Sequence, residues 1–155
     1  MDKKVEKAAK EAYKNLLKSL DEIGWKYERN DDIYAVKYSV KSDDFPMTFI
    51  MYVEPESHLY MIASELPIKV DEGKRADMAI AICRANYRLA DGWFEFDIGT
   101  GKIHFKIATS YSDSLISAAV IKYLLNISGS TVDKYNDKLI MIAKGMYKLD
   151  DFLKE

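Results

Sequence analysis

The chain has 155 residues, 48% of them hydrophobic and 31% charged, which is typical of a globular domain large enough to form a core without disulfides or metal. Its net charge of −2, with 23 basic and 25 acidic residues well mixed, lacks the basic excess of nucleic-acid binders. A single cysteine excludes an intrachain disulfide and a multi-cysteine zinc site. The N-terminus shows neither a signal peptide nor a membrane span. We therefore expect one cytoplasmic domain over residues 1–155, with no nucleic-acid or membrane partner.

The first predicted element is an amphipathic helix over residues 3 to about 23, with Gly24 at its end. Its polar face mixes both charge signs. This mixture favours packing on a sheet over binding to a membrane surface. The apolar stripe recurs at helical spacing and consists of Val5, Ala8, Ala9, Ala12, Tyr13, Leu16, Leu17, Leu20 and Ile23.

Two short strands follow this helix. Segments 25–28 and 33–38 alternate apolar and polar residues, and the Asn-Asp pair at 30–31 suits a tight hairpin turn between them. That register would place Tyr27 opposite Tyr34, which is a favourable cross-strand pair.

A polar loop at 41–44 leads to a third strand over residues 46–53. This segment is apolar on both faces, so we expect it at the centre of the sheet. Residues 58–63 return as the fourth strand. Pro67 ends the regular pairing because proline has no N–H to donate.

A second helix is predicted from about residue 72 to 89, with Asp71 as its N-cap. Apolar residues occupy nearly all of its sides, so we expect it to be largely buried. The only cysteine, Cys83, would then be a buried structural residue. Ala76, Ala79, Ile80, Cys83 and Tyr87 form one side, and Met78, Ile82, Ala85 and Leu89 widen it.

A hairpin about Thr100-Gly101 is the clearest local pattern in the chain. The alternation places Phe94, Phe96, Ile98, Ile103, Phe105 and Ile107 on the core face. On the other face, the expected register puts Asp97 beside His104 and Glu95 beside Lys106.

The last third of the chain is predicted to be helical, with Ser112 or Asp113 as the N-cap. Its apolar stripes run on both sides of Gly129. We expect one long helix that is kinked or thinned at this glycine, rather than two helices.

No segment carries a catalytic, cofactor or metal signature. The residues at 99–102, GTGK, lack the glycine and the hydroxyl residue of a phosphate-binding loop, so we interpret them as a hairpin turn. Cys83 with His104 could form a nucleophile and base, but a buried helix position favours a structural cysteine. Glu95 and Asp97 could act as acid and base, but their expected basic partners favour a surface charge ladder.

Trp93 falls on the face of the sheet opposite the predicted core. Two interpretations are open: helices cover both faces and bury this tryptophan, or an aromatic patch is left for a partner. Aromatic residues are enriched at the energetic centres of interfaces.

Residues 80–89, IAICRANYRL, followed by GWFEFD at 92–97 and GKI at 101–103, resemble the YbjN-like family. The segments LPIKVDEGKR at 66–75 and TVDKY at 131–135 fit it as well, so the likeness covers roughly residues 23–144. The motif is structural and has no catalytic residues to carry over. Cys83 replaces a more usual asparagine-like residue.

The resemblance implies a regulator of bacterial sensory transduction with the fold of type III secretion chaperones. This fold is expected to be an α+β domain with about six antiparallel strands, in the element order α-ββββ-α-ββ-α. We expect a non-enzymatic protein that binds a protein or peptide partner, as a homodimer, without a cofactor. The candidate partner-binding residues are Trp93, Glu95, His104 and Lys106.

The alternative is a small-ligand-binding protein or an enzyme without a recognisable motif. Its mark would be a closed pocket into which Glu95, His104 and Lys106 converge.

Overall fold

The computed structural model describes residues 2–41 and 46–155, so most of the polar loop expected at 41–44 lies outside the described residues. The described elements, in chain order, are α1 (Lys3–Glu22), β1 (Glu28–Asn30), β2 (Ala35–Val40), β3 (Met47–Glu54), β4 (Leu59–Lys69), α2 (Arg75–Tyr87), β5 (Trp93–Asp97), β6 (Lys102–Ser110), α3 (Ala118–Ala143) and α4 (Leu149–Lys154). Short 3-10 turns at Asp31–Ile33 and Glu72–Lys74 precede β2 and α2. This order confirms the predicted α+β class and adds α4.

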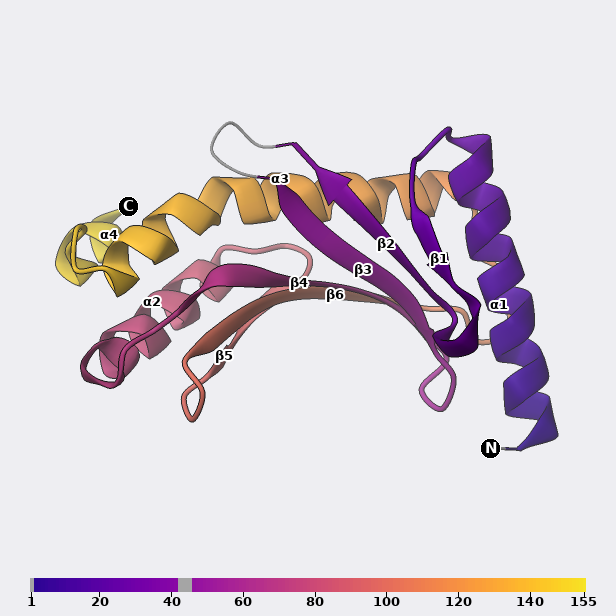
Figure 1. Cartoon of the computed structure of the whole chain (residues 1–155), viewed down its shortest axis with the longest axis horizontal. Coiled ribbons are helices and arrows are strands. Elements are labelled where there is room, and N and C mark those ends of the chain that lie inside the picture. Colours follow the sequence, from indigo (N-terminus) through magenta and orange to yellow (C-terminus); the bar gives the residue numbers. More distant parts are fainter. Residues whose placement is uncertain (1, 42–45) are drawn as a thin grey trace.

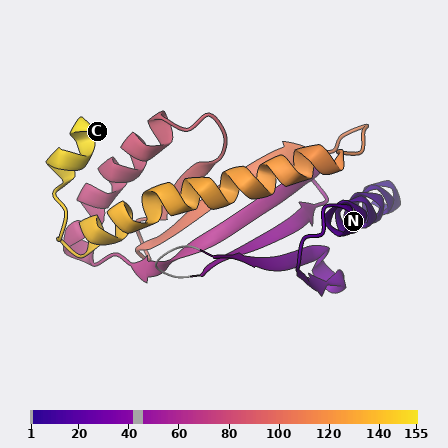
Figure 2. The same cartoon turned by 90° about the horizontal axis from the view of Figure 1, so that it is seen from above.

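The strands form an antiparallel sheet in the order β1-β2-β3-β4-β6-β5. Figure 1 shows this sheet as an arch, with α3 along its convex side and α1 standing at the β1 end. Seen from above, α3 crosses the strands diagonally, while α2 and α4 lie together at the far end (Figure 2). Neither view shows a helix across the concave side. Within residues 2–41 and 46–155, the sheet therefore has one face covered by helices and one open face.

The strand residues alternate between these two faces because the side-chain period of a strand is two. Phe49 and Met51 of β3 point to the covered face and are fully buried, while Ile50 between them is 46% exposed. The same alternation in β5 and β6 buries Phe94 and Phe105, whose rings contact each other edge to face. The core thus lies between the sheet and its helices.

Helix α1 packs on the covered side, as predicted. The side chain of Asp2 caps it by accepting a hydrogen bond from the Lys4 N–H at 2.8 Å. Ala12 and Leu16 are fully buried, and the hydroxyl of Tyr60 in β4 donates to the Ala12 carbonyl oxygen at 2.7 Å. Small alanine side chains allow this close approach of the helix to the sheet.

The first hairpin has a longer connection than predicted. Asn30 pairs with Ala35, and residues 31–34 form the turn, so the expected pairing of Tyr27 with Tyr34 is wrong. The Asp31 carboxylate holds this turn because it accepts hydrogen bonds from the Tyr13 hydroxyl at 2.8 Å and from the Arg29 guanidinium. Trp25 lies before β1 and packs on the edge of the core instead.

The second hairpin keeps the predicted faces but changes the partners. Asp97 pairs with Lys102, which leaves Ile98 outside the ladder and 60% exposed. The Asp97 carboxylate accepts hydrogen bonds from the Gly99 and Thr100 N–H groups at 2.8 and 3.2 Å, which stabilises a four-residue connection. The register shift is an even number of residues, so the paired side chains keep their predicted faces, but the prediction that Ile98 lies on the core face is wrong.

Helix α2 is buried on one side only, so the prediction that it is largely buried is wrong. Its buried residues are Met78, Ala81, Ile82 and Ala85, while Ile80 and Tyr87 are 49% and 83% exposed. Cys83 lies on the exposed side, so the prediction of a buried structural cysteine is wrong. The pattern failed here because a helix that is apolar on several sides does not indicate which one faces the core.

Helix α3 runs without interruption through Gly129, as predicted, but Ser117 caps it rather than Ser112 or Asp113. A Cβ at Gly129 would lie 3.7 Å from a Val40 methyl group, which is an ordinary van der Waals contact, so α3 packs on β2 here without requiring a glycine. Strand β4 continues past Pro67, where its ladder with β6 is irregular between Glu65 and Lys69.

Candidate functional site

The open face of the sheet brings the four predicted partner-binding residues together. Across the ladder of β5 and β6, Trp93 pairs with Lys106 and Glu95 pairs with His104. All four side chains are partly exposed. Alternation along the two strands is therefore sufficient to gather these residues on one surface, although the expected register was wrong.

The charged side chains of Glu95 and Lys106 form an ion pair on this surface, rather than pointing together into a closed pocket. The Glu95 carboxylate binds the Lys106 ammonium at 2.7 Å and accepts a hydrogen bond from the Trp93 indole at 3.0 Å. The hydrogen bonds from Lys106 and Trp93 lower the pKa of Glu95. The predicted Glu95–Lys106 ion pair is thus confirmed, although the two residues lie diagonally across the ladder.

His104 has a different partner from the one predicted. It lies 3.1 Å from the Glu65 carboxylate of β4, and Lys102 lies 3.0 Å from the same carboxylate. The hydrogen bond from Lys102 is the main reason why the pKa of Glu65 is lowered. Asp97 cannot contact His104 because its carboxylate is engaged in the hairpin turn.

Apolar side chains occupy the centre of the same face, which sequence reasoning missed. One row across the strands reads Lys37, Ile50, Ala63, Lys106 and Trp93, from β2 to β5. The next row reads Tyr52, Met61 and Ala108, and its β2 end, Ala35, is buried at 2% exposure. We call these two rows, with Glu95 and His104, the open-face patch. Its sequence signal is the run at 46–53 that is apolar on both faces.

The open-face patch is suited to contact rather than to chemistry. The side chains of His104 and Lys106 are 30% and 29% exposed and that of Glu95 is 43% exposed, and each is bound to a neighbour. The described pockets next to Arg84, Gly129, His58 and Pro67 are lined by none of the four candidates. Within residues 2–41 and 46–155, no three metal-ligating side chains gather.

The outer edge of β5 is already occupied. The side-chain amide of Asn86 in α2 accepts a hydrogen bond from the Phe94 N–H at 2.7 Å and donates one to the Phe94 carbonyl oxygen at 2.9 Å. These are the main-chain groups that an added strand would need. The β5 edge is therefore closed to strand addition at Phe94.

None of the described helices is both long and apolar enough to cross a membrane.

In sequence, a family model described as "YbjN: Putative bacterial sensory transduction regulator" matches residues 13–141. No curated protein matches the chain significantly.

Two solved structures share the fold. A chain in the crystal structure of the ExsC–ExsE complex aligns with a TM-score of 0.56 and 16% identity, over 84% of this chain and 95% of that chain. YbjN from E. coli aligns with a TM-score of 0.60 and 10% identity, over 86% of this chain and 92% of that chain. Both similarities confirm the α+β fold that the family resemblance implies.

Proposed function

The chain belongs to the YbjN family, and on this premise we propose that it is a non-enzymatic, chaperone-like or regulatory module that binds a segment of a partner protein. The observation that carries the proposal is the open-face patch, an aromatic and apolar surface on a sheet whose other face is covered. The ExsC–ExsE structure adds support, because a protein of this fold was solved there in complex with another protein.

The chemistry of the patch determines what it would recognise. Ile50 is 46% exposed at the centre, and Trp93 lies at the β5 end of the same row. The neighbouring charges neutralise each other within the ladder, as in the Glu95–Lys106 pair. The partner would therefore be held by apolar and aromatic contacts, with charges at the margin setting its orientation.

The dimensions of the patch set the length of the partner segment. The row from β2 to β5 spans five strands, which corresponds to about 19 Å at the usual strand spacing. An extended segment of about six residues, or a helix of about 13 residues, covers that distance. Either form would use alternating or helically spaced apolar anchors.

The same proposal includes a homodimer in the bacterial cytoplasm. Ile80, Cys83 and Tyr87 leave one side of α2 apolar and exposed, which supports self-association through this helix. Light scattering coupled to gel filtration gives the mass directly. A dimer that a Tyr87→Glu substitution converts to a monomer would support the proposal, and a monomer at all concentrations would refute this part of it.

The binding function can be tested by affinity capture of the tagged full chain from its source bacterium, followed by mass spectrometry. We expect one protein at near-stoichiometric yield, and its loss with Trp93→Ala or Ile50→Glu. Ile33→Glu is the matched control, because Ile33 is also exposed, at 62%, but lies in the β1–β2 connection. Retention of the same protein by both patch variants would refute the assignment of this face.

A further inference from the structure

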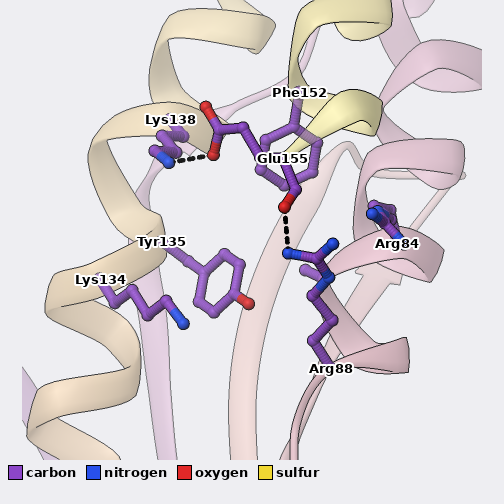
Figure 3. A pocket seen from close by; sticks show the side chains of 8 residues that line it. Arg84, Arg88, Lys134, Tyr135, Lys138, Phe152 and Glu155 are labelled. Carbon is purple, nitrogen blue, oxygen red and sulfur yellow. Dashed lines mark hydrogen bonds and ion pairs between the residues drawn. The ribbon is translucent and has the colours of Figure 1, made fainter.

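A second surface with the character of a binding site lies between α2, α3 and α4. A pocket of about 120 Å³ opens there, at the end of the molecule far from α1. Four basic side chains line it: Arg84 from α2, Arg88 directly after the end of α2, and Lys134 and Lys138 from α3 (Figure 3). Each pair is four residues apart, so two like charges share one side of each helix. Such pairs destabilise a helix unless an anion lies between them.

In this structure, the chain's own Glu155 supplies that anion. Its side-chain carboxylate binds the Lys138 ammonium, and its main-chain oxygen accepts a hydrogen bond from the Arg88 guanidinium. The hydrogen bond from Lys138 lowers the pKa of Glu155. One residue thus joins the basic groups of two helices.

The other two basic residues are not neutralised in this way. Among the described residues, neither Arg84 nor Lys134 has an acidic partner within ion-pair distance, and Lys134 lies 5.2 Å from the centre of the Tyr135 ring. The pocket therefore carries more positive charge than Glu155 compensates.

Helix α4 is seated in this pocket by two side chains. Phe152 is 3% exposed and lines the pocket together with Tyr135, and Glu155 follows directly after the end of α4, three residues beyond Phe152. The helix has only six residues and follows a turn in which Gly145 has a φ of 71°. A helix of this length is marginal by itself, so its position depends on contacts with the rest of the chain, among them those of Phe152 and Glu155.

We propose that this pocket binds an acidic, aromatic-bearing helical segment of a partner protein, and that α4 is its internal competitor. The space that α4 leaves open has room for about four water molecules, at roughly 30 Å³ each, and not for a peptide. The partner segment must consequently displace α4, presenting an aromatic residue and a carboxylate three residues apart. Further carboxylates on it would meet Arg84 and Lys134. This site is separate from the open-face patch and does not depend on it.

The test measures binding of a fluorescent peptide with the sequence of residues 147–155 to the full chain, by fluorescence anisotropy. We expect weak binding to the unaltered chain, because α4 competes at an effective concentration in the millimolar range. The double variant Phe152→Ala with Glu155→Gln should bind the probe at least tenfold more tightly. Glu155→Gln alone, which leaves Phe152 in place, should give about a threefold gain and guards against misfolding of the double variant.

Charge reversal distinguishes a binding site from a mere packing contact. Arg84→Glu with Lys134→Glu should weaken probe binding at least tenfold in the variant with α4 released, although the structure shows neither residue bound to Glu155. Lys122→Glu, an exposed lysine of α3 outside the pocket, is the control. A probe in which the residues corresponding to Phe152 and Glu155 are replaced by alanine and glutamine should not bind.

Failure of the double variant to bind the probe at millimolar concentration, while near-ultraviolet circular dichroism shows a native fold, would overturn the proposal. Unchanged binding after the reversal of Arg84 and Lys134 would do the same. Displacement of the probe by millimolar inorganic phosphate alone would indicate a small-anion site and would also contradict a peptide site.

Discussion

Replacement of Asn86 by alanine tests how the β5 edge is closed. The amide of this side chain forms two hydrogen bonds with Phe94, at 2.7 and 2.9 Å. A hydrogen bond contributes about 0.5–1.5 kcal/mol net, so losing both costs about 1–3 kcal/mol. Phe94 is only 2% exposed, which limits replacement by water and favours the upper half of that range. The higher helix propensity of alanine offsets about 0.5 kcal/mol, leaving a loss of about 2 kcal/mol.

Urea unfolding followed by far-ultraviolet circular dichroism measures this loss, and a melting temperature lowered by roughly 4–8 °C should accompany it. Asn126→Ala is the matched control, because Asn126 is an exposed asparagine of α3. Asn86→Asp refines the test: it keeps the acceptor for the Phe94 N–H, and protonation at low pH restores a donor. Its deficit relative to the unaltered chain should therefore shrink as the pH falls. A change below about 0.5 kcal/mol for Asn86→Ala would refute the role assigned to this side chain.

Three further predictions concern turns, charge and thiol exposure. Gly101→Ala should lower the free energy of unfolding by about 3 kcal/mol or more, since φ is +78° and a Cβ would lie 2.3 Å from the Val70 carbonyl oxygen. Gly99→Ala is the control and should lower it by less than about 1 kcal/mol, because its Cβ would lie close only to the flexible Asp97 carboxylate. Equal urea midpoints for the two variants would contradict this reasoning. The pKa of Glu95 is lower in the folded chain than its ordinary value of 4.5, so the stability it contributes is present above that value and disappears as the pH falls through the folded pKa. Glu95→Gln should accordingly show a smaller drop in urea midpoint than the unaltered chain between about pH 6 and pH 3, and identical profiles would contradict the ion pair. Cys83 is exposed in the single chain, so it should react with a thiol reagent within minutes in dilute, monomeric protein and more slowly in the homodimer proposed through α2; equal rates at all protein concentrations would contradict that interface.

The faces of the strands could be predicted from the sequence, while their partners could not. Period-two alternation assigned Phe94 and Phe105 to the core because side chains in a strand must alternate. The register depends on the length of each connection, and this length is set by carboxylates that hold the turns. Asp31 and Asp97 are typical turn residues in either register, so their presence did not reveal how many residues each turn contains.

The candidate site was predictable in part. Alternation was enough to place Trp93 and Lys106 on one surface, but it could not show that helices leave that surface open. Ile50 was missed because an apolar residue in a central strand is usually covered on both faces. The basic pocket has a sequence signal, namely two arginines spaced four apart at 84 and 88 and two lysines spaced four apart at 134 and 138.

Photo-crosslinking from position 50 tests the central proposal most directly. A photoreactive phenylalanine analogue at position 50 places the reactive group on the open-face patch, and the same analogue at position 33 places it on an exposed site outside the patch. After irradiation of living cells, we expect one discrete crosslinked protein from position 50 and none from position 33. Crosslinks to that protein from position 33 alone, or equal crosslinking from both positions, would contradict binding at the open face.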